Sequence, residues 1–387
     1  MAGSKSIVEY ESAFAGWLGA ERAFSFWKGR VALYAILKAL GVGEGDEVIL
    51  PGYTCVMNVN PIKYLGAKPI YVDIEPGTYN INVNLLPEKI TPKTKVIIAQ
   101  HTYGYPCDMD AIMDIAGRSG IPVVEDCCLS LGSKYKGKTV GTFGKAAYFS
   151  FQWNKPYTTG LGGMAVTSDS ALADKIERLR GSEMCLPSAK ESIMLWTQLA
   201  VYRSIVYPRT TAFAQSLFRY LTSKGAVVGS SSVSEFQPTM APDFFKGISG
   251  IQARGGLRQL KKIGQNTTHR LEMAQFYDQL FQQRGWLPRT YDGTTVQPVM
   301  VRYPVRIVEK AEALARSAKE GVELGSWFEC PLHPLETPLA AYDYQVGMCP
   351  EAEKACREVV NLPLHLRVNE KTAKRSVEFI TKFTQVQ

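Results

Sequence analysis

The sequence FSFQWNK at residues 149–155, followed by TTGLGG at residues 158–163, decides the fold. Residues 145–151 form an apolar run of strand length, and a second short strand, MAVT, is predicted directly after the glycines. Lys155 therefore lies on a loop just past a buried strand. Such loops carry chemistry in α/β enzymes, because the strand fixes the base of the loop while its tip faces a crevice. A solvated loop lysine is the alternative interpretation.

Asp126 favours the functional interpretation of this lysine. It ends the apolar run IPVVED, residues 121–126, so its carboxylate is predicted at the same kind of strand edge as Lys155. A buried lysine and a buried carboxylate on neighbouring strand ends need a compensating interaction. Pyridoxal phosphate provides one, because the lysine forms a Schiff base with its aldehyde and the carboxylate pairs with its protonated ring nitrogen. Ser150, five residues before the lysine, is placed to donate a hydrogen bond to the phosphate.

Further motifs accompany this pair in a fixed order along the chain. They are GDEVILP at residues 45–51, YT at 53–54, GAKP at 66–69, ED at 125–126 and GTFG at 141–144. The ordered set resembles the DegT/DnrJ/EryC1/StrS family of pyridoxal-phosphate aminotransferases, which mostly aminate nucleotide-linked keto-sugars. The resemblance implies an α/β fold of the aspartate-aminotransferase type (type I), with a large, mostly parallel-sheet domain and a smaller C-terminal α/β domain. We expect these domains to cover residues 1–250 and 251–387.

The resemblance also implies cofactor contacts. Gly29, Arg30 and Val31 fall where the family opens a helix whose N-terminal amides hold the cofactor phosphate. Arg30 replaces the usual hydroxyl residue, so its guanidinium is predicted to bind the phosphate; a solvated first-turn arginine is the alternative. Cys128 fits the small residue that packs on the cofactor ring, and Cys55 stands where the family has an aromatic residue close to the cofactor.

Three substrate-side positions follow from the same resemblance. They are His101 and Tyr103 in HTYG, and His333 in PLH, although a lone histidine is more often structural. Besides Arg30 and Cys55, two further places depart from the family. Leu129 replaces a glutamine or histidine that hydrogen-bonds the ring oxygen, and no asparagine lies near Phe245, where a partner subunit commonly supplies a phosphate ligand.

Strands and helices alternate along the first 170 residues. Strands are predicted at EVIL, PIYVD, KVIIAQ, PVVED, AAYFSF and GMAVT, and helices at about residues 7–18 and 30–40. This alternation indicates a mostly parallel sheet with ligands beyond the carboxyl ends of its strands. After residue 250 the patterns predict helices at 251–263, 269–284 and 310–320, a strand in MVRYPVRIV and a closing helix.

Residues 186–242 are predicted to form an apolar helical insertion. Its two helices lie at about residues 193–207 and 213–221, separated by Pro208. We expect this insertion to be buried on the sheet or at a dimer interface. A membrane-surface or lipid-substrate role is the alternative.

Composition limits the remaining function classes. The 387 residues, 45% apolar and 21% charged, are typical of a soluble globular chain long enough for two domains. The N-terminus lacks a signal-peptide core and no apolar run reaches about twenty residues, so we expect a cytoplasmic protein without membrane contact. The eight cysteines lack metal-type spacing, and no metal is expected. A net charge of +8 without a basic block suits an anionic ligand better than nucleic acid.

The sequence therefore predicts an aminotransferase. Lys155 is predicted to hold the cofactor and to transfer the proton, and Asp126 to keep the ring nitrogen protonated. By resemblance, the amino donor is glutamate or glutamine, the acceptor is a nucleotide-linked keto-sugar, and the enzyme is a homodimer. Two alternatives stay open: an enzyme acting on a non-sugar carbonyl, and a non-catalytic regulatory protein that binds pyridoxal phosphate.

Overall fold

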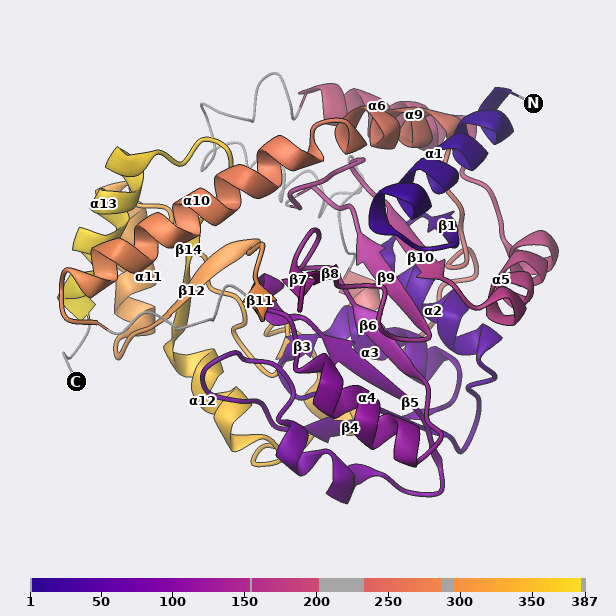
Figure 1. The fold of residues 1–387 in the computed structure, drawn as a ribbon, viewed down its shortest axis with the longest axis horizontal. Helices are drawn as coiled ribbons and strands as arrows, with labels where there is room; N and C mark the ends of the chain where they lie inside the picture. The colour runs from indigo at the N-terminus through magenta and orange to yellow at the C-terminus, as the bar shows by residue number, and fades with distance from the viewer. Residues whose placement is uncertain (1, 154, 202–232, 287–294, 384–387) are drawn as a thin grey trace.

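A seven-stranded sheet is the centre of the computed structural model, which describes residues 2–153, 155–201, 233–286 and 295–383 (Figure 1). Its strand order is β1-β10-β9-β6-β5-β2-β4. The five strands from β9 to β4 are parallel, and β10 is antiparallel to both of its neighbours, β1 and β9. The six strands predicted from the sequence are present, and β1 was not predicted. The strands are β1 Arg22–Phe26, β2 Glu47–Pro51, β4 Lys68–Val72, β5 Thr94–Gln100, β6 Val123–Asp126, β9 Ala146–Ser150 and β10 Gly163–Thr167.

Both faces of this sheet are covered by helices. Alternate strand residues enter two separate cores, as on β2, where Val48 and Leu50 join one core and Ile49 joins the other. The period of two is the geometry that a doubly covered sheet requires. The first core is completed by α2 Gly29–Ala39, α3 Val56–Tyr64, α5 Ser170–Glu183 and α12 Pro350–Glu358. The second is completed by α1 Ala2–Leu18, α4 Met109–Arg118 and α9 Gly250–Leu260.

A smaller antiparallel sheet has its own core. It pairs β12 Arg302–Arg306 with β14 Val359–Pro363. Around it pack α10 Ile263–Gln282, α11 Lys310–Glu320 and α13 Glu370–Ile380, and α10 runs from beside α9 to α13 (Figure 1). The domain boundary at residue 250 stays a prediction. Helix α9, which begins at that residue, packs against α1, one of the helices that cover the large sheet.

Short elements connect the large sheet and its helices with the part of the chain that contains the smaller sheet. The parallel pair of β3 Thr54–Cys55 and β13 Leu332–His333 places His333 opposite Cys55. A three-stranded sheet is formed by β11 Val296–Gln297, β7 Lys134–Tyr135 and β8 Lys138–Thr139. Single helical turns are η1 Val83–Leu85, η2 Pro87–Lys89, η3 Thr102–Gly104, η5 Val233–Phe236, η6 Leu339–Tyr342 and η7 Thr381–Phe383.

The predicted apolar insertion is described only in part. Helix α6 Ala189–Val201 covers the beginning of its first predicted helix. Leu195 is buried against Trp27, Trp153 and Leu161, whereas Ile193 and Trp196 are 59% and 56% exposed. The rest of both predicted helices lies in residues 202–232, outside the described residues. Within the described ranges, no helix has the length and apolar character needed to cross a membrane.

Candidate active site

Lys155 lies in the loop that follows β9, at the carboxyl edge of the large sheet. Its backbone N–H donates to the carbonyl of Gln152 (3.0 Å), and its Nζ lies 5.5 Å from the ring centre of Trp327. Burial lowers the pKa of the Lys155 amine, while nearby Cys128 and Asp126 act to raise it. Since this side chain is partly buried against other functional groups, the interpretation as a solvated loop lysine does not hold.

Asp126 ends β6 with its carboxylate held by neutral donors. Oδ1 accepts the backbone N–H of Cys128 (2.9 Å), and Oδ2 accepts Nδ2–H of Asn58 (2.6 Å). Asn58 is fixed in turn, because its amide also donates to Thr54 Oγ1 (2.9 Å) and to Gln100 Oε1 (3.3 Å). The described residues form no ion pair with Asp126, so its charge is available to a cationic group in the site.

Cys55, Cys128 and His333 lie around this lysine and carboxylate. Burial raises the pKa of both thiols, and each thiol lies within electrostatic range of Lys155 and Asp126. His333 pairs with Cys55 through β13 and β3. Burial lowers the pKa of His333, so its ring is neutral near pH 7. The structure therefore brings these three predicted residues to the predicted site.

The start of α2 forms a cradle for an anion beside Ser150. The cap residue Lys28 is extended and offers no side-chain cap, which leaves the first turn open to a ligand. A Cβ built on Gly29 would lie 2.9 Å from Ser150 Cβ, so glycine is what lets the helix begin against the end of β9. The predicted role of Val31 does not fit this cradle. Its side chain is buried in the core, and its N–H donates to the Lys28 carbonyl (3.1 Å).

Arg30 is buried rather than solvated. Its guanidinium lies 3.1 Å from a carboxylate oxygen of Glu235 and contacts the sulfur of Met57. Lys28 Nζ donates to the same carboxylate (3.0 Å), and burial together with Arg30 lowers the pKa of Lys28 to about 8. The solvated alternative for Arg30 is thus wrong, and its contact with a phosphate stays a prediction.

His101 is the substrate residue that the structure places elsewhere. The side chain is fully buried, Nδ1 accepts the backbone N–H of Cys107 (3.0 Å), and Nε2 lies 3.1 Å from Glu125 Oε2. Because Nδ1 is an acceptor, the ring proton is on Nε2 and is donated to Glu125. Both ring nitrogens are used inside the core, so the prediction that His101 faces the substrate is wrong.

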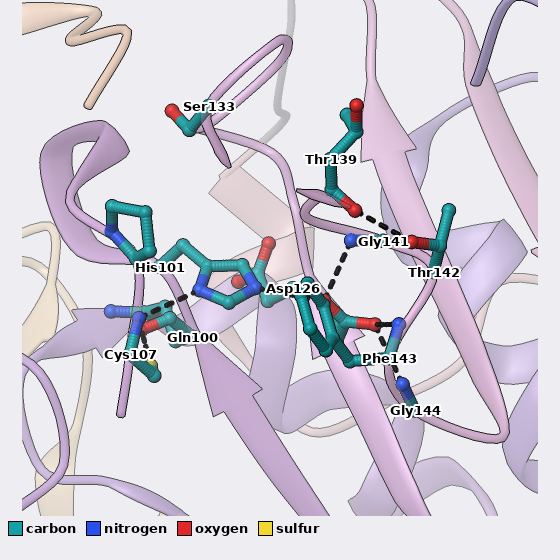
Figure 2. A network of polar contacts seen from close by, with 12 residues as sticks. Gln100, His101, Cys107, Asp126, Ser133, Thr139, Gly141, Thr142, Phe143 and Gly144 are labelled. Carbon is teal, nitrogen blue, oxygen red and sulfur yellow. Dashed lines mark hydrogen bonds and ion pairs between the residues drawn. The ribbon is translucent and has the colours of Figure 1, made fainter. Parts of the chain in front are cut away.

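Glu125 ties the loop at residues 141–144 to the sheet. In Figure 2 the loop's backbone N–H groups point at one carboxylate, which accepts from Gly141 (2.6 Å), Phe143 (2.7 Å) and Gly144 (2.7 Å). His101, Glu125 and Cys127 lie close enough to ligate one cation. These hydrogen bonds already use both carboxylate oxygens and both ring nitrogens, so we interpret the group as a structural network.

Replacing Glu125 by glutamine should lower the free energy of unfolding by about 3–5 kcal/mol, the range for breaking a buried charged interaction. The amide NH₂ would face backbone N–H groups that now donate to a carboxylate oxygen. Urea unfolding of both proteins measures the difference. Glu177→Gln is the control, because its exposed ion pair with Arg22 should contribute less than about 1 kcal/mol. An effect of Glu125→Gln no larger than that of the control would contradict the network.

Tyr103 does not face the site but contacts the residues that surround Trp327. Its hydroxyl lies 2.7 Å from that of Tyr53 and donates to the Trp327 carbonyl. The ring of Tyr103 stacks on Phe328 (6.2 Å between centres), and the Phe328 N–H donates to Tyr53 (3.2 Å). Because the Tyr103 hydroxyl is used in this way, its predicted direct contact with substrate does not fit the structure.

Leu129 and Phe245, which mark two of the departures from the family pattern, lie in the interior. Leu129 is buried in the first core. Phe245 is also buried, and its ring centre lies 5.7 Å from those of Phe26 and Tyr34. Neither side chain is polar, so neither can make the hydrogen bond that the family pattern has at these two places.

Three residues of the site were not predicted from the sequence: Asn58, Arg302 and Trp327. Asn58 had a local signal, because it follows Thr54 by four residues on a helix that starts directly after a strand end. Arg302 and Trp327 come from the part of the chain after residue 250. An arginine at the start of a predicted strand is not by itself a sign of function.

A model of the DegT/DnrJ/EryC1/StrS aminotransferase family matches residues 2–193 and 218–381. GDP-perosamine synthase of Escherichia coli O157:H7 is 46% identical over 180 residues, which are 46% of this chain and 50% of that protein. The match thus spans about half the length of that relative. The pleiotropic regulatory protein of Geobacillus stearothermophilus is 30% identical over 382 residues, 97% of this chain and 89% of that protein. The solved structure of ntda from Bacillus subtilis with bound cofactor PMP has the same fold, with 24% identity, a TM-score of 0.73 and coverage of 97% of this chain and 76% of that one.

Proposed function

Because the chain belongs to the DegT/DnrJ/EryC1/StrS aminotransferase family, we propose that it transfers an amino group from glutamate or glutamine to a nucleotide-linked keto-sugar. The observation that carries this proposal is the placement of Lys155 and Asp126 at one edge of the sheet, with both oxygens of Asp126 held by neutral donors. The half-length match to GDP-perosamine synthase supports an acceptor of the sugar class.

The residues at this edge fit pyridoxal phosphate as the cofactor. Lys155 would hold it covalently, Asp126 would pair with its ring nitrogen, and Ser150 with the first turn of α2 would receive its phosphate. The open first turn and the close approach at Gly29 are the features that suit a phosphate. When bound, the cofactor supplies the electron sink for breaking a bond at the substrate carbon that carries the amino group.

Lys155 is the proton-transfer group in this proposal. A lysine acts as a base only when neutral, and burial lowers its pKa, which increases the neutral fraction near pH 7. Asp126 holds a proton on the ring nitrogen, because Asn58 and the Cys128 N–H keep its carboxylate oriented. Trp327 covers the Lys155 amine and limits its contact with water.

The donor half of the reaction is the first test. Protein loaded with pyridoxal phosphate is mixed with L-glutamate or L-glutamine and no acceptor, and loss of the visible cofactor absorbance is followed together with release of the oxo acid. The amine-form protein is then offered nucleotide-linked keto-sugars, free keto-sugars and simple keto acids. We expect the nucleotide-linked sugars to restore the absorbance fastest. Faster return with simple keto acids would favour an enzyme acting on a non-sugar carbonyl.

A regulatory role is the second candidate, because the pleiotropic regulatory protein matches 97% of this chain. In that case the protein would bind pyridoxal phosphate at Lys155 without turning over either amino donor. Absence of oxo acid after prolonged incubation with both donors would favour this candidate over the enzyme.

The proposed enzyme is a cytoplasmic homodimer whose partner covers the exposed side chains of α6. Ile193, Trp196 and Val201 are large apolar groups that soluble proteins commonly cover. Sedimentation without detergent, with and without anionic liposomes, tests this arrangement. A dimer that ignores liposomes agrees with it, whereas protein that pellets with lipid would contradict it.

A further inference from the structure

Arg302 is a cation in the site that makes no direct ion pair with the residues the structure describes. It is the first residue of β12, and its Cζ lies 4.8 Å from the ring centre of Trp327, the same indole that Lys155 Nζ approaches. Among the residues that the structure describes, none forms a hydrogen bond or an ion pair with its guanidinium. Glu323 acts on it electrostatically, but the Glu323 carboxylate bonds to His365 Nε2 (2.9 Å). A largely buried guanidinium in this state has a strong requirement for an anion.

The guanidinium of Arg302 is held in place by its surroundings. A Cβ built on Gly325 would lie 2.1 Å from Nη1 of Arg302, so the guanidinium rests against glycine backbone on one side and near the indole on another. The preceding residue, Val301, donates its N–H to the Tyr103 carbonyl (3.0 Å). Arg270 Nη1 donates to the Val301 carbonyl (2.8 Å). The start of β12 is therefore fixed beside the turn that follows β5.

Trp327 is equally well fixed. Its backbone N–H donates to Asn361 Oδ1 (3.0 Å), and its backbone carbonyl accepts from Asn361 Nδ2 (3.1 Å) and from the Tyr103 hydroxyl. The buried Lys310 ammonium binds the carbonyls on either side of the tryptophan, those of Ser326 (3.1 Å) and Phe328 (3.0 Å). The backbone that carries the indole is thus fixed, and the indole itself packs against Phe328 and His333, with 6.2 Å and 6.5 Å between ring centres. A side chain positioned before the ligand binds loses less conformational freedom on binding.

These contacts favour a carboxylate as the missing anion. A guanidinium presents a rigid planar fork that matches the two oxygens of a carboxylate, and such bidentate pairs are the strong charged hydrogen bonds. The Arg302 guanidinium and the Lys155 amine both lie beside the Trp327 ring, so a group bound by Arg302 belongs to the molecule that reacts at Lys155. The anion cradle at α2 is a separate place, formed by other residues.

We propose that Arg302, packed against Trp327, binds a substrate carboxylate and so orients the reacting group toward Lys155. The proposal rests on the proposed function, since it requires a substrate that reacts at this lysine. Two sources carry the required chemistry: the carboxylates of the amino donor and an acidic group on the acceptor.

Glutarate binding tests the subsite without any turnover. Isothermal titration compares glutarate with its neutral diamide on protein loaded with pyridoxal phosphate. Arg302→Met should weaken glutarate binding roughly 10- to 100-fold, as expected for loss of a hydrogen bond between charged groups, and should leave the diamide unaffected. Arg302→Lys keeps a positive charge at this position and should weaken glutarate binding less than Arg302→Met does. That difference would show that the loss in Arg302→Met comes from the missing charge and not from a folding defect.

Arg306→Met is the matched control, because Arg306 lies on the same strand but already pairs with Glu351 and with Glu358 (3.2 Å). It should bind glutarate like the wild type. Unchanged glutarate binding in Arg302→Met would overturn the proposal, whether or not the protein is an aminotransferase. Conversely, glutarate binding that depends on Arg302 supports the subsite even if no turnover is found.

The two half-reactions identify the source of the carboxylate. If the donor carries it, Arg302→Met should lower kcat/KM for glutamate by the same roughly 10- to 100-fold and leave the return reaction with the acceptor unchanged. A loss confined to the acceptor half-reaction assigns the carboxylate to the acceptor. Wild-type rates in both halves would overturn the subsite.

Discussion

Replacing Lys155 by alanine should reduce both half-reactions by about four orders of magnitude, the upper range for loss of a positioned acid–base group. The covalent anchor disappears with the same change, so the visible absorbance of the Schiff base between cofactor and lysine should vanish while non-covalent binding persists. Reduction with borohydride followed by mass spectrometry measures covalent attachment directly. The protein should stay folded, because the Lys155 side chain forms no ion pair with the described residues.

Lys145→Ala is the control for this substitution. Lys145 precedes β9 as Lys155 follows it, and its exposed ammonium pairs with Asp169 at the surface. The control should keep its absorbance and its rate. Cofactor that borohydride still attaches covalently to Lys155→Ala would show that another lysine forms the Schiff base. The assignment of the whole site would then be wrong.

The pair at the centre of the site could be predicted because its signals are local. Lys155 and Asp126 each follow an apolar strand, and the carboxyl ends of parallel strands meet at one edge. The structure orders β6 and β9 as neighbours, as this argument requires. Strand β1 was missed because Ser25 interrupts its apolar pattern. That serine is buried, and its hydroxyl donates to Glu11 (2.5 Å), a contact that no local pattern reveals.

The error at His101 has a simple geometric cause. Successive side chains of a strand point to opposite faces, and Gln100 lies opposite Asp126 in the register of β5 and β6. Gln100 therefore shares the side of Asp126 and bonds to Asn58 and Thr54, while His101 turns to Glu125. The alternation rule gives this arrangement only together with the register of β5 and β6, which the structure supplies.

Contacts between distant parts of the chain could not be predicted. The pairing of β3 with β13 brings His333 to Cys55, and β12 brings Arg302 to the indole of Trp327. Each depends on how the part of the chain after residue 250 packs on the large sheet. Single-residue patterns carry no information about that packing, so the sequence could suggest His333 only through the family resemblance.

Replacing Asp126 by asparagine should lower kcat/KM by about 10³-fold or more, the range for removing one preorganised electrostatic group at a reacting centre. Asparagine keeps the size of the side chain but has no charge with which to hold a proton on the cofactor ring. Cofactor binding should survive, because Lys155, Ser150 and the start of α2 are unchanged. Stopped-flow absorbance with glutamate measures the rate, and borohydride trapping measures the bound fraction.

The charge of Asp126, rather than its hydrogen bonds, should account for most of this loss. Asn58→Ala is the matched variant, because it removes the donor to Oδ2 but leaves the carboxylate, and the Cys128 N–H still holds Oδ1. We expect a loss of about tenfold, the value of one hydrogen bond. Lower pH should narrow the gap between Asp126→Asn and the wild type, since the solvent then supplies the proton that Asp126 otherwise retains. An Asp126→Asn enzyme within a few-fold of the wild type at neutral pH, or a gap that widens on acidification, would contradict this role.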